Sequence, residues 1–440
     1  MKKATLMLIL AWFSSPAWWG APAAAAQPVT RSGALAGLPS APGPQVAKIK
    51  ALGDNEWVNL GAPAADPKWG HARGRSWSSK MVYAPDLGGA FLNGQGVHGY
   101  IKPDGYFMDD IWLYDLYTHR WICLYPGTDT RHFVENIKKG ELKVNDDGQL
   151  VDKEGQVVPF SAVAGHSYQD HTYDPDLGRY IFGGHGDGIG SEQHVRNQEW
   201  CKAGRELLLV QGKTDKAAGA PYCFNTVSGK FERPPAGAIG RAHGGAGGSF
   251  LVDLYYLPTK RVYWQHSQGT VRLADPATYR WTDAKPTGSP PKGGDVGVCY
   301  DSKRDRIYLS DAPSRTPDVR GGGPIYIYDV KTNAWSNPPM QEHAMRWPGA
   351  NNACVHYDAA ADRVLCFFGW NAQNRKSRGI SSYDPGTGSW EAPAPIPDAV
   401  FSGCVNGFYS PEVNAHFFYV AGDSNDRGTM WAYRYKRARK

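Results

Sequence analysis

The chain has 440 residues, is 41% hydrophobic and 12% aromatic, and contains 52 glycines and 32 prolines. Its formal charge is +6, but two positive charges lie in the first 26 residues and five in the last seven, which leaves the body near −1. A near-neutral body excludes an electrostatic basis for nucleic-acid binding, and no segment has the 18 apolar residues of a membrane span.

Residues 1–26 have the pattern of a signal peptide. Two lysines precede an apolar run over residues 4–13, and residues 24–26 are small alanines suited to cleavage. The pattern predicts a secreted or periplasmic protein. Residues 27–50 are rich in Pro, Ala and Gly, and we predict that they form a flexible lead-in.

The rest of the chain repeats two kinds of hairpin phrase. YDPDLGRYIFGG from Tyr173 is an example of the first kind, and YDVKTNAW from Tyr328 is an example of the second. In both, Asp, Asn, Pro and Gly favour a turn, while the flanking aromatic and β-branched residues favour strands. Such self-similarity is typical of a repeat protein, and two hairpins per repeat make one four-stranded propeller blade.

Six repeats predict six blades within a single domain over residues 51–440. Their innermost strands are expected near residues 77–83, 167–173, 249–256, 295–300, 352–357 and 403–409. The last repeat lacks a fourth strand, and residues 56–60 have the aromatic and apolar alternation to supply it. We therefore predict an all-β, six-bladed propeller closed by an N-terminal strand, with seven blades as the alternative.

The phrases resemble the kelch repeat of the galactose oxidase central-domain superfamily. Gly183 and Gly184 match the glycine pair that follows the second kelch strand, whereas blade four has Ser310 and Asp311 there. The resemblance implies a propeller and says little about function. The resemblance also suggests a copper radical oxidase. However, we find no Cys that is an evident cross-link partner of a Tyr in the propeller loops, and we expect no further domain that could supply a copper ligand.

Insertions at about residues 128–164 and 188–219 interrupt the repeats. The first is expected to contain a hairpin turned at Asp147 and Gly148, and the second a short helix within residues 192–210. We predict that Cys201 pairs with Cys223, because a disulfide there would fix the second insertion to its own blade. Long insertions in compact repeats usually carry function.

The repeat pattern separates the two faces of the ring. The turns within hairpins fall on one face, here called the turn face, and are expected to be structural. The connections between second and third strands and between blades fall on the other, here called the loop face. The loop face collects polar and aromatic residues, and those we predict to bind substrate are His71, Arg73, His98, His171, His243, His266, Arg346, Trp370 and Asn371.

Blade two has the densest set of candidate catalytic residues. We predict His166 or His185 as a general base, Tyr168 or Tyr222 as a general acid, and Arg241 as the group that binds a carboxylate. The sequence itself identifies no cofactor. Three imidazoles, from His166, His185 and His243, could nevertheless bind a structural or catalytic divalent metal.

Aromatic, His, Arg and Asn side chains on one face suit a polysaccharide or another carbohydrate. The leading hypothesis is an exported polysaccharide lyase that cleaves uronate-containing polymers by β-elimination, and the layout resembles the propeller-type ulvan lyases. The alternatives are a non-catalytic kelch module that binds carbohydrate or protein, and a sugar mutarotase or epimerase. We expect a monomer.

Overall fold

The computed structural model describes residues 30–75, 78, 80–93, 100–159, 169–182, 197–210, 221–234, 252–267, 269–291, 297–310, 325–339, 341, 354–370, 378–393, 395–401, 404–422 and 426–437. The described residues from Arg31 onward belong to one compact unit. None of the helices in these ranges is long and apolar enough to cross a membrane.

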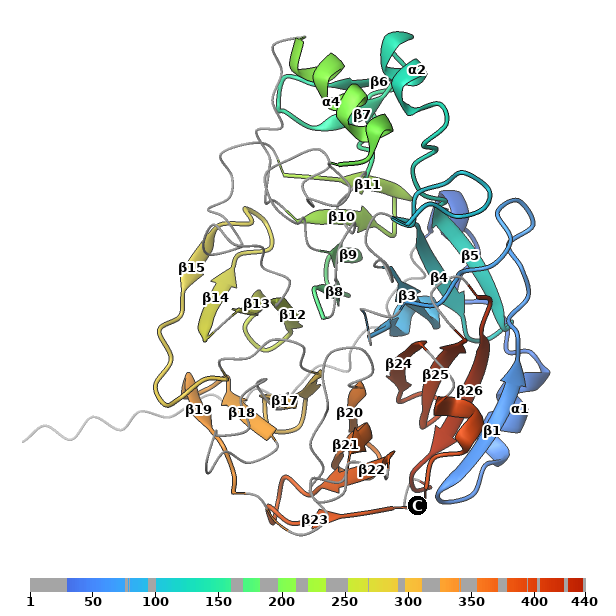
Figure 1. Ribbon diagram of the computed structural model, residues 1–440. Helices are drawn as coiled ribbons and strands as arrows, with labels where there is room; N and C mark the ends of the chain where they lie inside the picture. The colour runs from blue at the N-terminus through green and yellow to red at the C-terminus, as the bar shows by residue number, and fades with distance from the viewer. Residues whose placement is uncertain are drawn as a thin grey trace, which may run out of the picture. The chain divides into compact units, whose positions relative to one another are not determined.

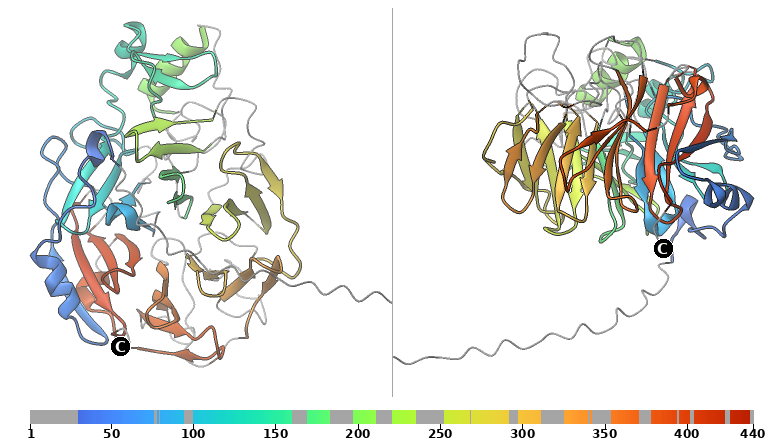
Figure 2. Two further views of the ribbon diagram at one scale, coloured as in Figure 1. Left: turned by 180° about the vertical axis from the view of Figure 1, so that it is seen from behind. Right: turned by 90° about the horizontal axis from the view of Figure 1, so that it is seen from below.

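The described strands form six four-stranded antiparallel sheets and one two-stranded sheet. The six sheets surround a common centre, each with its first strand innermost (Figure 1). The view from below shows strands running across the ring from one face to the other (Figure 2). The prediction of an all-β, six-bladed propeller is confirmed, and the seven-bladed alternative is wrong.

The blades follow chain order. Blade one contains β2 (Val82–Ala84), β3 (Gly89–Leu92), β4 (Ile111–Asp115) and β5 (Arg120–Tyr125), and η2 (Pro85–Leu87) lies in its first turn. Blade two contains β8 (His171–Asp174), β9 (Arg179–Phe182), β10 (Tyr222–Asn225) and β11 (Lys230–Glu232). Blade three contains β12 (Val252–Leu257), β13 (Val262–Ser267), β14 (Thr270–Ala274) and β15 (Trp281–Asp283).

Blades four and five repeat this order. Blade four contains β16 (Val298–Asp301), β17 (Arg306–Ser310), β18 (Ile325–Asp329) and β19 (Ala334–Ser336). Blade five contains β20 (Cys354–Asp358), β21 (Arg363–Trp370), β22 (Arg378–Tyr383) and β23 (Trp390–Glu391), and η3 (Asp398–Phe401) follows it.

Blade six joins both ends of the domain. It contains β24 (Cys404–Ser410), β25 (Ala415–Ala421) and β26 (Thr429–Arg434), and β1 (Glu56–Gly61) is its outer strand. Figure 1 shows β1 beside β26, as the unpaired edge of the sixth repeat predicted. Trp57 packs on Tyr433 with ring centroids 4.6 Å apart. The guanidinium of Arg434 donates to four carbonyl oxygens, two just before β1 and two in blade six.

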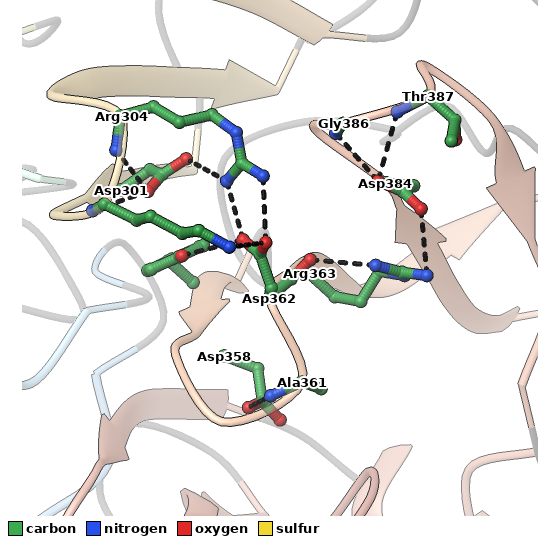
Figure 3. A network of polar contacts seen from close by, with 11 residues as sticks. Asp301, Arg304, Asp358, Ala361, Asp362, Arg363, Asp384, Gly386 and Thr387 are labelled. Carbon is green, nitrogen blue, oxygen red and sulfur yellow. Dashed lines mark hydrogen bonds and ion pairs between the residues drawn. The ribbon is translucent and has the colours of Figure 1, made fainter. Parts of the chain in front are cut away.

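One turn geometry recurs on the turn face because the hairpin needs a residue with positive φ. Gly178 has φ of 61° in blade two, and Asp362 has 56° at the equivalent position of blade five. Ion pairs connect neighbouring turns (Figure 3): Arg304 contacts Asp362 at 2.6 Å, and Arg363 contacts Asp384 at 2.9 Å. The charged side chains of these turns therefore stabilise the fold by pairing with one another.

The predicted flexible lead-in needs correction where the structure describes it. Within residues 31–50, η1 (Gly33–Leu35) precedes α1 (Pro44–Ala51). Leu35 and Ile49 are fully buried, and Ile49 packs in the apolar cluster between blades six and one. Burial of these side chains offsets the entropy lost on ordering a segment rich in Pro, Ala and Gly.

The two insertions pack together outside the ring (Figure 1). The elements are α2 (Phe133–Lys138), the predicted hairpin of β6 (Leu142–Val144) and β7 (Leu150–Asp152), and α4 (Glu199–Val210). Cys201 is buried in the insertion core, whereas Cys223 packs in another cluster with strands of blade three. Both remain thiols, so the predicted disulfide is wrong.

Candidate functional site

Much of the predicted site lies outside the described residues. This is true of His98, His166, Tyr168, His185, Arg241, His243, Arg346 and Asn371. The backbone of Trp370 ends strand β21, and its side chain is not described. The roles predicted for these residues remain predictions.

His171 and Tyr222 lie in the interior and not on a substrate-facing surface. The Nε2 atom of His171 is 3.1 Å from the carbonyl oxygen of Lys80, and burial lowers the pKa of His171 to about 3. The hydroxyl of Tyr222 accepts a hydrogen bond of 3.0 Å from Arg233. Both side chains are almost fully buried, so we correct their assignments to positions in the core of blade two.

His266 is also buried, and both of its ring nitrogens have partners. Nδ1 lies 3.0 Å from a carboxylate oxygen of Asp253, and Nε2 accepts a hydrogen bond from the backbone N–H of Gly269. The proton therefore resides on Nδ1, and the ring connects β12, β13 and the following turn. We correct its assignment from substrate binding to support of this turn.

The remaining described candidates, His71 and Arg73, lie where the ring closes. The preceding turn is shaped by Asp66, whose side chain accepts hydrogen bonds from the backbone N–H groups of Lys68, Trp69 and Cys123. Since Cys123 belongs to β5, this carboxylate attaches the turn to the outer strand of blade one. The segment then passes over the loop face toward the innermost strand.

Tyr419 holds this segment against blade six. Its buried hydroxyl donates to the carbonyl oxygen of Ala72 at 2.7 Å and accepts from the N–H of Gly428 at 2.8 Å. The backbone N–H of Gly74 also donates to the carbonyl of Asp426 at 3.2 Å. Residues 426–428, which precede β26, are thereby held beside the segment that carries His71 and Arg73.

A buried ion pair also holds the segment that carries His71 and Arg73. The side chain of Arg75 contacts Asp110 at 2.8 Å and donates to the carbonyl of Arg73 at 2.8 Å. Burial opposes ionisation of Asp110, but the charges of Arg75 and Lys102 outweigh it and lower the pKa of this carboxyl. The backbone of Arg73 is therefore held by a charged network.

His71 is partly exposed and neutral at pH 7. Burial and the nearby Arg427 guanidinium lower its pKa, while a hydrogen bond to the carbonyl of Pro63 acts in the opposite direction. In a neutral imidazole, the nitrogen that donates to Pro63 carries the proton and the other nitrogen keeps a lone pair. His71 thus presents a neutral base whose pKa is lowered by burial and by the charge of Arg427.

Two aromatic rings, those of Trp69 and Tyr106, extend the group of His71 and Arg73 toward blade one. Trp69 and Tyr106 are half-buried, and their ring centroids lie 5.7 Å apart in an edge-to-face arrangement. Arg131 lies over the Tyr106 ring at 5.4 Å and pairs with Asp129. Burial and Asp129 raise the pKa of Tyr106, so its hydroxyl stays protonated.

We name these residues the closure surface, defined as Trp69, His71, Arg73, Tyr106 and Arg427. They come from three connections on the loop face: the one before blade one, the loop from β3 to β4, and the loop from β25 to β26. Tyr106 and Arg427 were missed in the sequence, although both lie in loops after second strands, where the repeat places other candidates.

A cavity of about 220 Å³ lies among the innermost strands. Every blade contributes to it, and each contributes a tyrosine from the end of its first strand: Tyr83, Tyr173, Tyr256, Tyr300, Tyr357 and Tyr409. The tyrosine hydroxyls donate to acidic or amide side chains of the turn face, for example Tyr173 to Asp86 at 2.8 Å. This repeated bond explains the tyrosine in the repeat.

Lys80 contributes the only charged side chain among the described lining residues. Its Nζ donates to the carbonyl of His171 at 2.7 Å and to that of Leu254 at 3.1 Å, which links blades one, two and three. Burial lowers the pKa of Lys80 to about 7, against the attraction of Asp253 and Asp170. Burial likewise raises the pKa of both carboxyls.

Comparison with known proteins does not identify the chain: no protein-family model matches it, and no curated protein matches its sequence. Within the described part of the chain, no group of three or more His, Cys, Asp or Glu side chains is arranged to hold a metal ion. The three histidines named above as candidate metal ligands lie outside that part.

Proposed function

We propose that the protein is an exported, kelch-type propeller that cleaves uronate-containing polysaccharides by β-elimination at the closure surface. The observation that carries this proposal is that hydrogen bonds from Tyr419 and Gly74 hold the segment of His71 next to residues 426–428, where the charge of Arg427 helps to lower the pKa of His71. A base next to a cation suits this reaction, because the proton to be removed lies next to the uronate carboxylate. Neutralising that carboxylate stabilises the charge that develops as the proton leaves.

Each described group of the closure surface has a role in this scheme. Arg73 and Arg427 bind the carboxylate, and Trp69 stacks on a sugar ring. His71 removes the C5 proton, the electron pair of that bond forms the C4–C5 double bond, and the C4–O bond breaks. Tyr106 gives its hydroxyl proton to the departing oxygen. The proton on His71 then returns to Tyr106 through solvent, so no water is consumed.

The test uses a panel of anionic polysaccharides, followed at the ultraviolet absorbance of unsaturated uronates. The wild-type protein should produce this absorbance from at least one uronate polymer, and His71→Gln should reduce the rate by about 100-fold or more. The control is Lys143→Gln, which changes an exposed side chain of strand β6 in the insertion and should retain the rate.

Other results would redirect or reject the proposal. A loss confined to the double variant His166→Ala and His185→Ala would move the reaction to blade two. Binding without absorbance from any uronate polymer would favour the non-catalytic module. Full activity in His71→Gln would exclude the closure surface as the catalytic site.

A further inference from the structure

The first insertion begins directly beside Tyr106 of the closure surface. Tyr106 forms an isolated antiparallel bridge with Asp129. Next to this bridge, the backbone N–H and the hydroxyl of Thr130 both donate to the carbonyl oxygen of Gly105, at 3.1 and 2.8 Å. The backbone at Tyr106 is therefore attached to the start of the insertion by more than one bond.

The side chain of Arg131 crosses this junction and ends over the aromatic ring of Tyr106. Its guanidinium carbon lies 5.4 Å from the ring centroid. Gly105 makes this path possible, because its φ is 86° and a Cβ atom there would lie 2.5 Å from both Cδ and Nε of Arg131. The missing side chain at residue 105 thus lets the stem of Arg131 pack on the backbone.

Asp129 orients the guanidinium of Arg131. Its two carboxylate oxygens accept hydrogen bonds from Nε at 2.9 Å and from Nη2 at 3.0 Å, and one of them also accepts from the backbone N–H of Arg131. Nδ1 of His132 lies 3.1 Å from the same carboxylate. Chiefly through the bonds from Arg131, the pKa of Asp129 is lowered to about 2. A two-point bond of this kind fixes the plane of the guanidinium as well as its place.

The charges of this ion pair act on the Tyr106 hydroxyl in opposite directions. Burial and the Asp129 carboxylate raise the pKa of Tyr106, whereas Arg131 opposes them through its positive charge and a hydrogen bond. Two other charged groups face Tyr106. Asp104, in the same loop, acts in the same direction as Asp129, and Nζ of Lys102 lies 5.7 Å from the ring centroid. Arg131 is therefore the group of the insertion that favours loss of the phenol proton.

We propose that Arg131 is a positioning residue of the elimination, which holds a positive charge over the Tyr106 ring and so makes the hydroxyl a stronger acid toward the departing oxygen. The inference rests on the proposed function, in which the O–H bond of Tyr106 breaks and its proton moves to that oxygen. Arg131 then stabilises the phenolate that remains, without touching the substrate. A general acid works best when its pKa lies close to the working pH, and the charge of Arg131 acts in that direction.

The first test titrates Tyr106 by NMR in protein labelled isotopically at tyrosine Cζ, with Tyr106→Phe to assign the signal. Arg131→Gln removes the cation and leaves the anion, so the pKa of Tyr106 should rise. Asp129→Asn removes the anion and leaves the cation, so the pKa should fall. Both variants break the same ion pair, so a purely structural role would shift the pKa in the same direction in both. The control Lys139→Gln removes a cation of the same insertion that pairs with Glu135, and it should cause no shift.

The second test follows the reaction on a uronate polymer that the wild type cleaves. Arg131→Gln should lower kcat by up to about tenfold, because Tyr106 becomes a weaker acid. KM should stay within about twofold of the wild-type value, since Arg131 does not contact the substrate. The fall of kcat at high pH should also move to higher pH in this variant. Circular dichroism of each variant verifies that it is folded.

Three outcomes would overturn the role of Arg131: an unchanged pKa of Tyr106 in Arg131→Gln, shifts in the same direction in Arg131→Gln and Asp129→Asn, or a wild-type kcat in Arg131→Gln. The titration needs no substrate, so it separates this inference from the proposed function. Opposite shifts in a protein that cleaves no uronate polymer would reject the elimination itself. Cleavage without the opposite shifts would reject only the role of Arg131.

Discussion

Replacement of Tyr419 by phenylalanine tests how the closure surface is assembled. The substitution removes one hydroxyl, which bonds both Ala72 and Gly428. Each of the two groups left buried without a partner costs about 1–3 kcal/mol, so Tyr419→Phe should lower the free energy of unfolding by about 2–6 kcal/mol. Urea denaturation followed by tryptophan fluorescence measures this loss.

Tyr180→Phe is the matched control for this substitution. The Tyr180 hydroxyl is buried, and it is among the side-chain atoms without a hydrogen-bond partner. Removing it leaves no group unsatisfied, so Tyr180→Phe should be neutral or slightly stabilising. Equal losses in the two variants would refute the claim that the Tyr419 hydroxyl joins the two segments.

The same variant should change the acidity of His71. Arg427 disfavours protonation of His71 and thereby lowers its pKa. Without the Tyr419 hydroxyl, residues 426–428 keep only the Gly74–Asp426 hydrogen bond to the segment of His71, so Arg427 should act less on the imidazole and the pKa of His71 should rise toward 6.5. An NMR titration of His71 in wild type, Tyr419→Phe and Arg427→Gln measures this shift. An unchanged pKa in both variants would refute the proposed electrostatic contact.

The remaining predictions concern acid stability, the insertion and the closing blade. Because the pKa of His171 is about 3 in the folded protein and 6.5 ordinarily, stability should fall by about 1.4 kcal/mol for each pH unit from 6.5 down to about 3. Urea titrations of wild type and His171→Gln across this range should differ in slope, and equal slopes would contradict the assignment. In Gly204→Ala the new Cβ would lie 2.3 Å from a side-chain carbon of Phe133, so α4 and α2 should move apart at a cost of about 1–3 kcal/mol. Hydrogen exchange of the backbone amides of α2 and α4 measures this change, and unchanged protection would contradict it. Arg434→Met removes hydrogen bonds to four carbonyls and should cost about 2–4 kcal/mol, visible as a lower Tm by calorimetry, whereas an unchanged Tm would show that β1 is held without them.

The ring could be predicted from the sequence because its determinants are local and repeated. Turn residues such as Asp362 recur at fixed distance from strand residues, and alternation in residues 56–60 identified the closing strand. The hairpin between Val144 and Leu150 followed from its Asp and Gly turn for the same reason. These signals arise from neighbours in the chain and need no knowledge of distant contacts.

The interior partners could not be predicted, since they come from distant parts of the chain. His171 was expected to face substrate, but its ring partner is the carbonyl of Lys80, which lies 91 residues away. Thr172, on the same strand, likewise has a distant partner, since it accepts a hydrogen bond from the backbone N–H of Tyr256 in blade three. Helix α1 was missed because Val46 and Ile49 are apolar positions in a composition that otherwise indicates flexibility.

The pairing of β1 with β26 makes the proposed site a product of the last step of folding. Residues 56–61 meet residues 429–434, so the contact that completes the ring has nearly the greatest sequence separation that the described chain allows. Contacts of long sequence separation form late, because loop-closure entropy must first be overcome. The segment carrying His71 follows β1 directly, and the loop carrying Arg427 precedes β26 directly. A molecule whose ring has not closed would therefore lack the site, even if its other five blades were fully formed.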